Sequence, residues 1–227
     1  MSHWTRLIRF TAVETGGKKV HIGQPVDAKV DVGLAILKRH SLKAHEISGS
    51  SALDPDARVT SNALTVDTLL EPIAPEQIGF GTSAVLQTIH IPYPRPHTNS
   101  HPSRRPTSKR EPIRLRGRIG RRYRKDAKDV KESEALDYVL GYTGANDVKS
   151  SLASIPRFRL EKHQLATSQW TFSKSFDLTN PIGPALVRNT KHIDPQNIPL
   201  TATVNSRLLQ DGTTATRYSA WQRRSRS

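Results

Sequence analysis

The stretch Leu140–Val148, with the sequence LGYTGANDV, decides the fold of the later part of this chain. Its β-prone beginning and its Gly-Ala-Asn-Asp end predict a strand that leads into a loop. Just before it, Asp129 and Glu132 have the three-residue spacing of a capping box, and this spacing predicts a short helix. We therefore expect an ordered region that begins at Lys125 with a short helix and continues into a strand.

The segments after this strand also predict mostly β-structure. Residues 172–187, FSKSFDLTNPIGPALV, predict a strand, a turn and a second strand, because the Asn-Pro and Gly-Pro pairs are turn formers. A second short helix is expected over residues 162–168. One continuous strand is expected from about Leu200 to Asp211.

Residues 1–78 predict a small β-rich module. Short runs of β-prone side chains alternate there with turn formers such as Thr15-Gly16-Gly17. The expected strands are, in chain order, Leu7–Val13, Val20–Ile22 and Val30–Leu37.

The net charge of +15 is concentrated in one tract. Residues 1–90 hold nine basic and nine acidic side chains, whereas residues 91–125 hold twelve basic side chains and the single acid Glu111. Six prolines lie within residues 91–112. Because this composition lacks an apolar face to bury, we expect residues 79–124 to be an irregular, disordered basic segment.

A basic tract of this kind can bind nucleic acid, so a nucleic-acid-binding protein that acts through residues 95–125 is one alternative. The tract has one aromatic side chain near its basic end, Tyr123, and so lacks a stacking platform for bases. This makes nucleic acid an unlikely partner. The chain has no cysteine, which excludes disulfide frameworks and thiol nucleophiles, and no apolar run near the ~20 residues of a membrane span.

Four motifs, in order and spacing, resemble the fumarylacetoacetate hydrolase family, with a fungal type of N-terminal module. They are GYTGANDV at 141–148, HQL at 163–165, WTFSKSFD with the following NPIGP at 170–184, and VNSRLLQDGTT at 204–214. The resemblance implies an α+β, mostly β fold, an incomplete mixed β-sandwich or β-roll. It divides the chain into the module 1–78, the basic segment 79–124, a partial catalytic domain 125–214 and a basic irregular tail 215–227.

The resemblance also implies a site. In this family a divalent cation, usually Mg²⁺ and otherwise Mn²⁺ or Ca²⁺, is held by an E-x-E pair and by the aspartate of A-N-D-V, here Asp147. Lys174 matches the lysine that holds the substrate oxyanion or carboxylate, and is the candidate catalytic residue. Gln164 and Lys174 are the candidate substrate-binding residues. A small oxo-acid substrate, a homodimer and a cytoplasmic location follow from the family, with a mitochondrial location as the alternative.

The E-x-E strand is missing from its expected place. Leu115–Lys125, LRGRIGRRYRK, stands there with a matching length, so that Arg116 and Arg118 replace two carboxylates. Arg-Gly-Arg can be encoded as CGA GGT CGA, and this sequence gives Glu-Val-Glu when it is translated one nucleotide later. Residues 149–160 are also extra relative to the family, and the tail after Thr214 fits a shifted frame. The chain thus resembles a truncated or frame-shifted gene model.

Three functional hypotheses follow. The first is a family enzyme by descent, for metal-dependent carbon–carbon hydrolysis, decarboxylation or tautomerisation of 2-oxo or 1,3-dicarbonyl acids. In this hypothesis, the present chain is inactive and does not bind the metal, because two ligands are arginines. The second is the nucleic-acid-binding protein described above. The third is a non-catalytic partner of intact family dimers.

Overall fold

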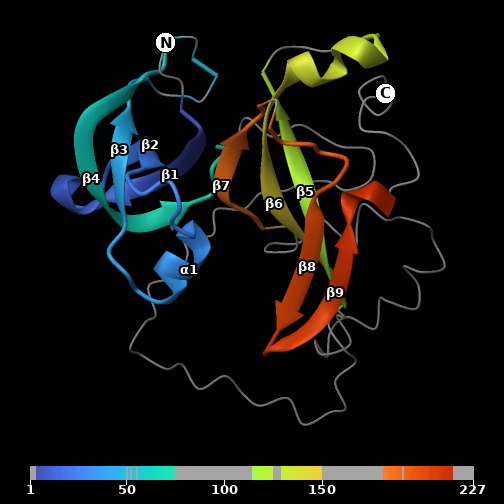
Figure 1. Cartoon of the computed structure of the whole chain (residues 1–227). Coiled ribbons are helices and arrows are strands. Elements are labelled where there is room, and N and C mark those ends of the chain that lie inside the picture. The colour runs from blue at the N-terminus through green and yellow to red at the C-terminus, as the bar shows by residue number, and fades with distance from the viewer. Residues whose placement is uncertain are drawn as a thin grey trace, which may run out of the picture.

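The computed structural model describes residues 4–49, 51, 53–54, 56–74, 114–124, 129–149, 181–190 and 192–216. At positions 114–116, 118, 147–149 and 216 it describes the backbone alone. The fold is mostly β, as the sequence predicts (Figure 1). The strands are β1 Arg6–Ala12, β2 Val20–Pro25, β3 Lys43–Ile47, β4 Val59–Leu70, β5 Arg114–Tyr123, β6 Val139–Lys149, β7 Ile182–Arg188, β8 Pro199–Val204 and β9 Arg207–Thr213.

The helices in the described residues are short. They are α1 Val32–Leu37 and the 3₁₀ helices η1 Val13–Thr15, η3 Glu132–Tyr138 and η5 Thr214–Thr216. None of them has the length and apolar character needed to cross a membrane.

Strands β1 to β4 form a small closed barrel. Strand β1 pairs with β2 and with β4, while β3 pairs with both β2 and β4, so the four strands close on themselves. Ile8, Phe10 and Leu69 are fully or almost fully buried in its interior. Gly23 allows the strands to approach closely, because a Cβ atom there would lie 2.7 Å from the carbonyl oxygen of His45.

Strand β1 belongs to a second group of strands as well. Its first residues pair with β7, where Arg6 lies opposite Val187 and Leu7 opposite Leu186. The result is one seven-stranded sheet in the order β2-β3-β4-β1-β7-β6-β5. A buried cluster that includes Trp4, Leu7, Leu140 and Leu186 fills the junction, so the N-terminal module and the later strands share one core.

The basic segment contains a strand where irregular structure was expected. Residues 114–123 form β5, which pairs with β6 over almost its whole length. The expectation was wrong for these ten residues because β6 supplies the backbone partners, which composition does not reveal. Ile119 and Tyr123 also pack against the buried Val139 and Tyr142, so alternate positions of β5 do have an apolar role.

One strand prediction and the start of one predicted helix are also corrected. Residues 32–37, expected in a strand, form α1 because the Asp31 carboxylate accepts a hydrogen bond from the Leu34 amide at 2.8 Å and caps the helix. The capping box at Asp129 and Glu132 does not form. Asp129 has a φ of 53°, and η3 begins after Lys131 without a side-chain cap.

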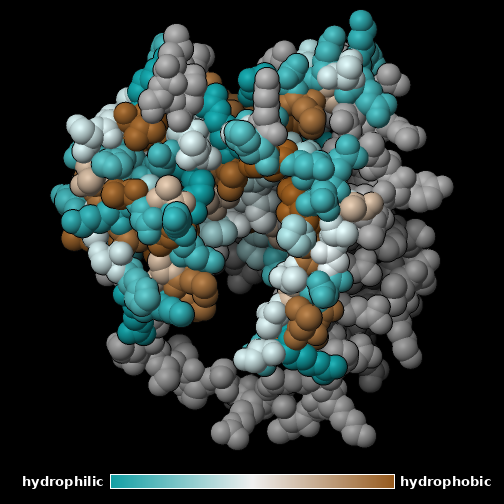
Figure 2. Space-filling model, viewed as in Figure 1, coloured by the Kyte–Doolittle hydropathy of each residue, from teal (hydrophilic) through white to brown (hydrophobic). Residues whose placement is uncertain are grey.

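The expected strand from Leu200 to Asp211 is a hairpin of two strands instead. Asn205 and Ser206 have φ values of 48° and 63°, which is the left-handed backbone of a two-residue hairpin turn. Exposed apolar residues occur on this hairpin and on α1, and Figure 2 shows apolar surface in small separate patches on the face it presents. The exposed apolar residues of α1 include Leu34 and Leu37, and those of the hairpin are Leu208 and Leu209.

Candidate functional site

The candidate site lies at the end of β6, where the A-N-D-V motif pairs with β5. Arg116 lies directly opposite Asp147, and Arg118 lies opposite Ala145. Residues opposite each other in an antiparallel pair share a face of the sheet, and alternate residues return to that face. Arg116, Arg118 and Asp147 therefore occupy one face of the sheet.

The β8–β9 hairpin covers the other face of the sheet at Gly117, where a Cβ atom would contact Thr201 and Ala202. Gly117 is the pairing partner of Asn146 on β6. The Gly117 amide donates to Oε1 of Gln210 at 2.9 Å, and Nε2 of Gln210 donates to the Gly117 carbonyl at 3.3 Å. Strand β5 is the last strand of the sheet. The Gln210 amide thus occupies the place of a further strand and satisfies both backbone groups at the centre of the expected metal strand.

Strand β6 carries two buried polar atoms near this position. The backbone N–H of Asn146 donates to the Pro181 carbonyl at 3.0 Å. This bond joins the end of β6 to the residue before β7. Oδ1 of Asn146 and Oγ1 of Thr143 are buried and have no hydrogen-bond partner among the residues that the structure describes. Such atoms are costly to leave unpaired, so they mark the part of β6 where a donor or a water would be stabilising.

The residues do not fit a divalent cation. A hard cation needs several oxygen ligands, preferably carboxylates, and two of the three expected positions are arginines. Among the side chains that the structure describes, no group of three His, Cys, Asp or Glu could hold a metal ion. Arg116 and Arg118 instead place two positive charges on the β5 side of this position. The β5 side of the candidate site is therefore cationic.

The other predicted site residues, Gln164 and Lys174, lie outside the described residues, so their roles stay predictions. The structure brings Asp147 opposite Arg116 and adds Gln210, to which the sequence analysis gave no role. The Gln-Asp-Gly letters of the VNSRLLQDGTT motif were the available signal, but they did not reveal the partner 93 residues away.

Comparisons with known proteins agree on a family. The model of the fumarylacetoacetate (FAA) hydrolase C-terminal domain matches residues 81–221. Caffeoylpyruvate hydrolase of Neonothopanus nambi is 41% identical over 197 residues, which cover 77% of this chain and 64% of that protein. The mitochondrial oxaloacetate tautomerase fahd2 of Xenopus laevis is 38% identical over 90 residues, 40% of this chain and 26% of the relative. This chain thus spans less than two thirds of these relatives.

Solved structures of low sequence identity share the fold. The crystal structure of 2-hydroxyhepta-2,4-diene-1,7-dioate isomerase from Mycobacterium marinum has a TM-score of 0.57 at 20% identity and covers 93% of this chain and 75% of that chain. A fumarylacetoacetate hydrolase from Exiguobacterium antarcticum has a TM-score of 0.58 at 16% identity, covering 97% and 81%. With the family model matched over more than half of its length, the chain belongs to the fumarylacetoacetate hydrolase family.

Proposed function

We propose that this chain descends from a hydrolase of acylpyruvates and that, as written, it neither binds the metal nor catalyses the reaction. The register of β5 on β6 carries the proposal, because it sets Arg116 opposite Asp147. The substrate class comes from the 41% identity to caffeoylpyruvate hydrolase. In such a reaction water adds to the acyl carbonyl, and the bond to the pyruvate methylene carbon breaks to give a carboxylic acid and pyruvate.

Electrostatics supports the loss of the metal. Replacing two carboxylates by Arg116 and Arg118 changes the formal charge around the site by four units. A guanidinium about 5 Å from a dication is repelled by about 7 kcal/mol at an effective dielectric constant of about 20. Asp147 alone supplies one of the three carboxylates that the resemblance implies, so it does not offset two such repulsions.

The backbone at Gly117 has room for a Cβ atom. An added Cβ at Gly117 would lie 3.6 Å from the Thr201 carbonyl oxygen and 4.0 Å from Cβ of Ala202, which are ordinary contact distances. The Glu-Val-Glu of the shifted reading frame would put its valine at this position. The spacing therefore supports the proposal that β5 descends from an E-x-E strand, and the genomic sequence across codons 79–160, translated in all three forward frames, tests that descent.

The test of function compares the chain with the triple variant Arg116→Glu, Gly117→Val, Arg118→Glu. Titration calorimetry with Mg²⁺ should give no binding heat for the chain as written and a saturable heat for the variant. A caffeoylpyruvate assay should detect no hydrolysis by the unmodified chain. Tight Mg²⁺ binding or turnover by the unmodified chain would refute the proposal.

The same descent supports three further proposals: magnesium as the ion of the intact site, a homodimer, and a cytoplasmic location. Light scattering of the purified chain tests the dimer. Cell fractionation tests the location against a mitochondrial one, which is the compartment in the name of the Xenopus laevis relative.

A further inference from the structure

A second cavity lies at the other end of β6. Its volume is about 500 Å³, and it is lined by η3, the first residues of β6, the end of β7 and the loop 189–196. It reaches β6 at Val139 and Leu140, whereas the candidate metal position is Asp147. At about 3.3 Å per strand residue, the two places are roughly 23–26 Å apart along β6, so this cavity is a separate site.

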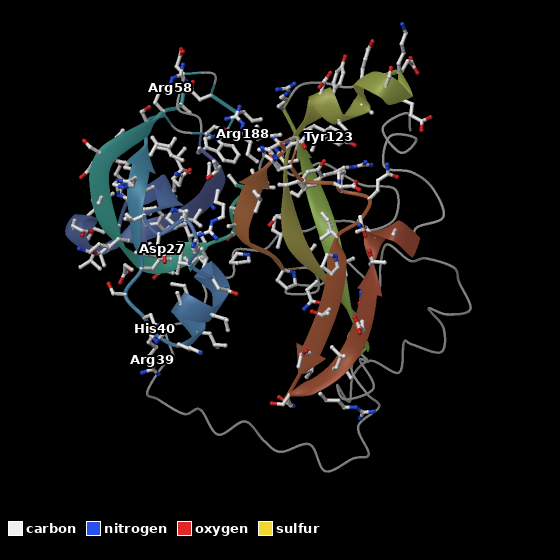
Figure 3. The ribbon with its side chains drawn as sticks, viewed as in Figure 1. Asp27, Arg39, His40, Arg58, Tyr123 and Arg188 are labelled. Atoms are coloured by element: carbon white, nitrogen blue, oxygen red, sulfur yellow. The ribbon has the colours of Figure 1, made fainter. Side chains whose placement is uncertain are left out.

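Arg188 is the central cation of this cavity. Its guanidinium stacks over the ring of Trp4 at 5.5 Å from the centroid, and Trp4 is only 2% exposed. Figure 3 shows Arg188 at the end of β7, in the junction between the barrel and the rest of the sheet. The contact with the buried ring helps to hold the half-buried guanidinium in position before any ligand binds.

The Arg188 guanidinium is partly buried. Within the described part of the chain, no acceptor hydrogen-bonds to it and no carboxylate oxygen lies within 4.0 Å of it. Burial, and then the neighbouring Arg124 guanidinium, lower the pKa of Arg188 from its ordinary value. A half-buried cation beside a second cation is stabilised by an anion that bonds to both.

Arg124 is also held in place. Its Nε donates to the Asp137 carbonyl oxygen, and its backbone amide donates to the Tyr138 carbonyl at 2.9 Å. Both acceptors are backbone carbonyls, and the Arg124 side chain is exposed. No described carboxylate oxygen lies within 4.0 Å of Arg124 either.

The remaining lining is part apolar and part polar, and it includes the exposed acidic residues Asp137 and Asp194. Leu136, Val139 and Ile193 supply apolar surface. Asn189 is fixed between two partners, since its Nδ2 donates to the Leu136 carbonyl at 2.8 Å and its Oδ1 accepts from the Tyr142 hydroxyl at 3.5 Å. Asp194 is exposed, and its Oδ1 already accepts from the Gln196 amide at 2.9 Å.

We propose that this cavity binds a small organic carboxylate, with the carboxylate between Arg188 and Arg124 and an apolar body against Leu136, Val139 and Ile193. The volume lies within the usual range of small-molecule sites, and the walls combine an apolar strip with polar and charged side chains. Guanidinium groups bind carboxylates with charge-assisted hydrogen bonds. This site is independent of the metal position and of the proposed catalysis.

The test is a ¹⁹F NMR titration of the full chain with 4-fluorobenzoate, with the uncharged 4-fluorobenzamide as the matched ligand. The benzoate should bind saturably, and the benzamide at least tenfold more weakly. Arg188→Gln should weaken benzoate binding at least tenfold, and Arg124→Gln should weaken it severalfold. Arg188→Lys should lie between the wild-type chain and Arg188→Gln, because it keeps the charge and loses the planar guanidinium.

Arg39→Gln is the control, since Arg39 is exposed in the turn after α1, away from the cavity (Figure 3). It should leave benzoate binding unchanged. Thermal unfolding checks that each variant is folded. If Arg188→Gln does not fold, Arg124→Gln still tests the same cavity. Equal affinity for benzoate and benzamide would overturn the proposal, and so would an equal loss in Arg39→Gln or no loss in folded variants at both cavity arginines.

Discussion

The side-chain amide of Gln210 bonds to both backbone groups of Gly117, at 2.9 Å and 3.3 Å, across 93 residues of sequence. A primary amide has one acceptor oxygen and a donor NH₂ group, so it can pair with a strand edge as a peptide group does. Open strand edges readily pair with other chains. Gln210 closes the centre of the β5 edge and attaches the β8–β9 hairpin to the sheet.

Gln210→Ala should lower the free energy of unfolding by about 1–3 kcal/mol, because it removes two hydrogen bonds and leaves part-buried backbone groups unpaired. Urea unfolding measures the change. Hydrogen exchange of the Gly117 amide should become faster in the same variant. Thr203→Ala, at an exposed position of the same hairpin, is the control and should change stability by less than about 0.5 kcal/mol. Unchanged Gly117 exchange would show that Gln210 does not protect the edge.

Two glycines of the β5–β6 pair should respond to alanine in opposite ways. Gly117 has room for a Cβ, whereas a Cβ at Gly141 would lie 2.4 Å from the Val187 carbonyl oxygen. Gly117→Ala should stabilise the fold by about 0.4–1 kcal/mol through the loss of unfolded-state entropy. Gly141→Ala should destabilise it by about 1–3 kcal/mol, because backbone must move. Thermal unfolding of the two variants measures this difference, and equal effects would contradict the close approach of β6 and β7.

The barrel should lose stability in acid through Glu46. A hydrogen bond from His21 at 2.8 Å, and then one from Asn62 at 3.0 Å, lower the pKa of Glu46 from its model-compound value of 4.5. A carboxyl group whose pKa is lower in the folded state stabilises the fold above its unfolded pKa, and this contribution is lost as the pH falls through the folded pKa.

The variant Glu46→Gln removes the titrating carboxyl group and should therefore remove its contribution to the pH dependence of stability. Between pH 7 and pH 3, the wild-type chain should lose more stability than this variant, as measured by urea unfolding at each pH. Glu134→Gln, at an exposed position of η3, should keep the wild-type pH dependence. A parallel pH dependence of wild type and Glu46→Gln would exclude Glu46 as the source.

A fourth prediction concerns the carboxylate that remains at the candidate metal position. In the triple variant that restores Glu-Val-Glu at 116–118, the further change Asp147→Asn should weaken Mg²⁺ binding at least tenfold, because the amide keeps the shape of the ligand and loses its charge. Titration calorimetry with Mg²⁺ on the triple and quadruple variants measures the difference in affinity. Asp211→Asn, exposed on β9, is the matched control, and a similar loss there would argue against Asp147 as a ligand.

The local sequence was sufficient for several elements. It predicted strands near β1, β2 and β6 and the turn at Gly16-Gly17, whose φ values are 64° and 70°. These features depend on β-prone side chains and on the freedom of glycine to adopt positive φ, and both are properties of neighbouring residues. The family motifs were equally visible, and the match to the family model confirmed them.

Helix α1 and the β8–β9 hairpin were missed although their signals are local. Asp31 stands one residue before α1 as an N-cap, but the β-branched residues that follow it favoured a strand. Asn205 and Ser206 form the hairpin turn without a glycine, so the usual sequence signal of such a turn was absent.

The chain's motifs and its pattern of β-prone residues thus determined its family, its β-rich class and the residue types at the candidate site. Tertiary structure alone decided that the arginine-rich residues 114–123 form β5, that Arg116 lies opposite Asp147 of the paired strand β6, and that Gln210 closes the free edge of β5. The physical reason is that a strand is completed by hydrogen bonds to distant partners, whereas composition and periodicity report only on neighbours in the sequence.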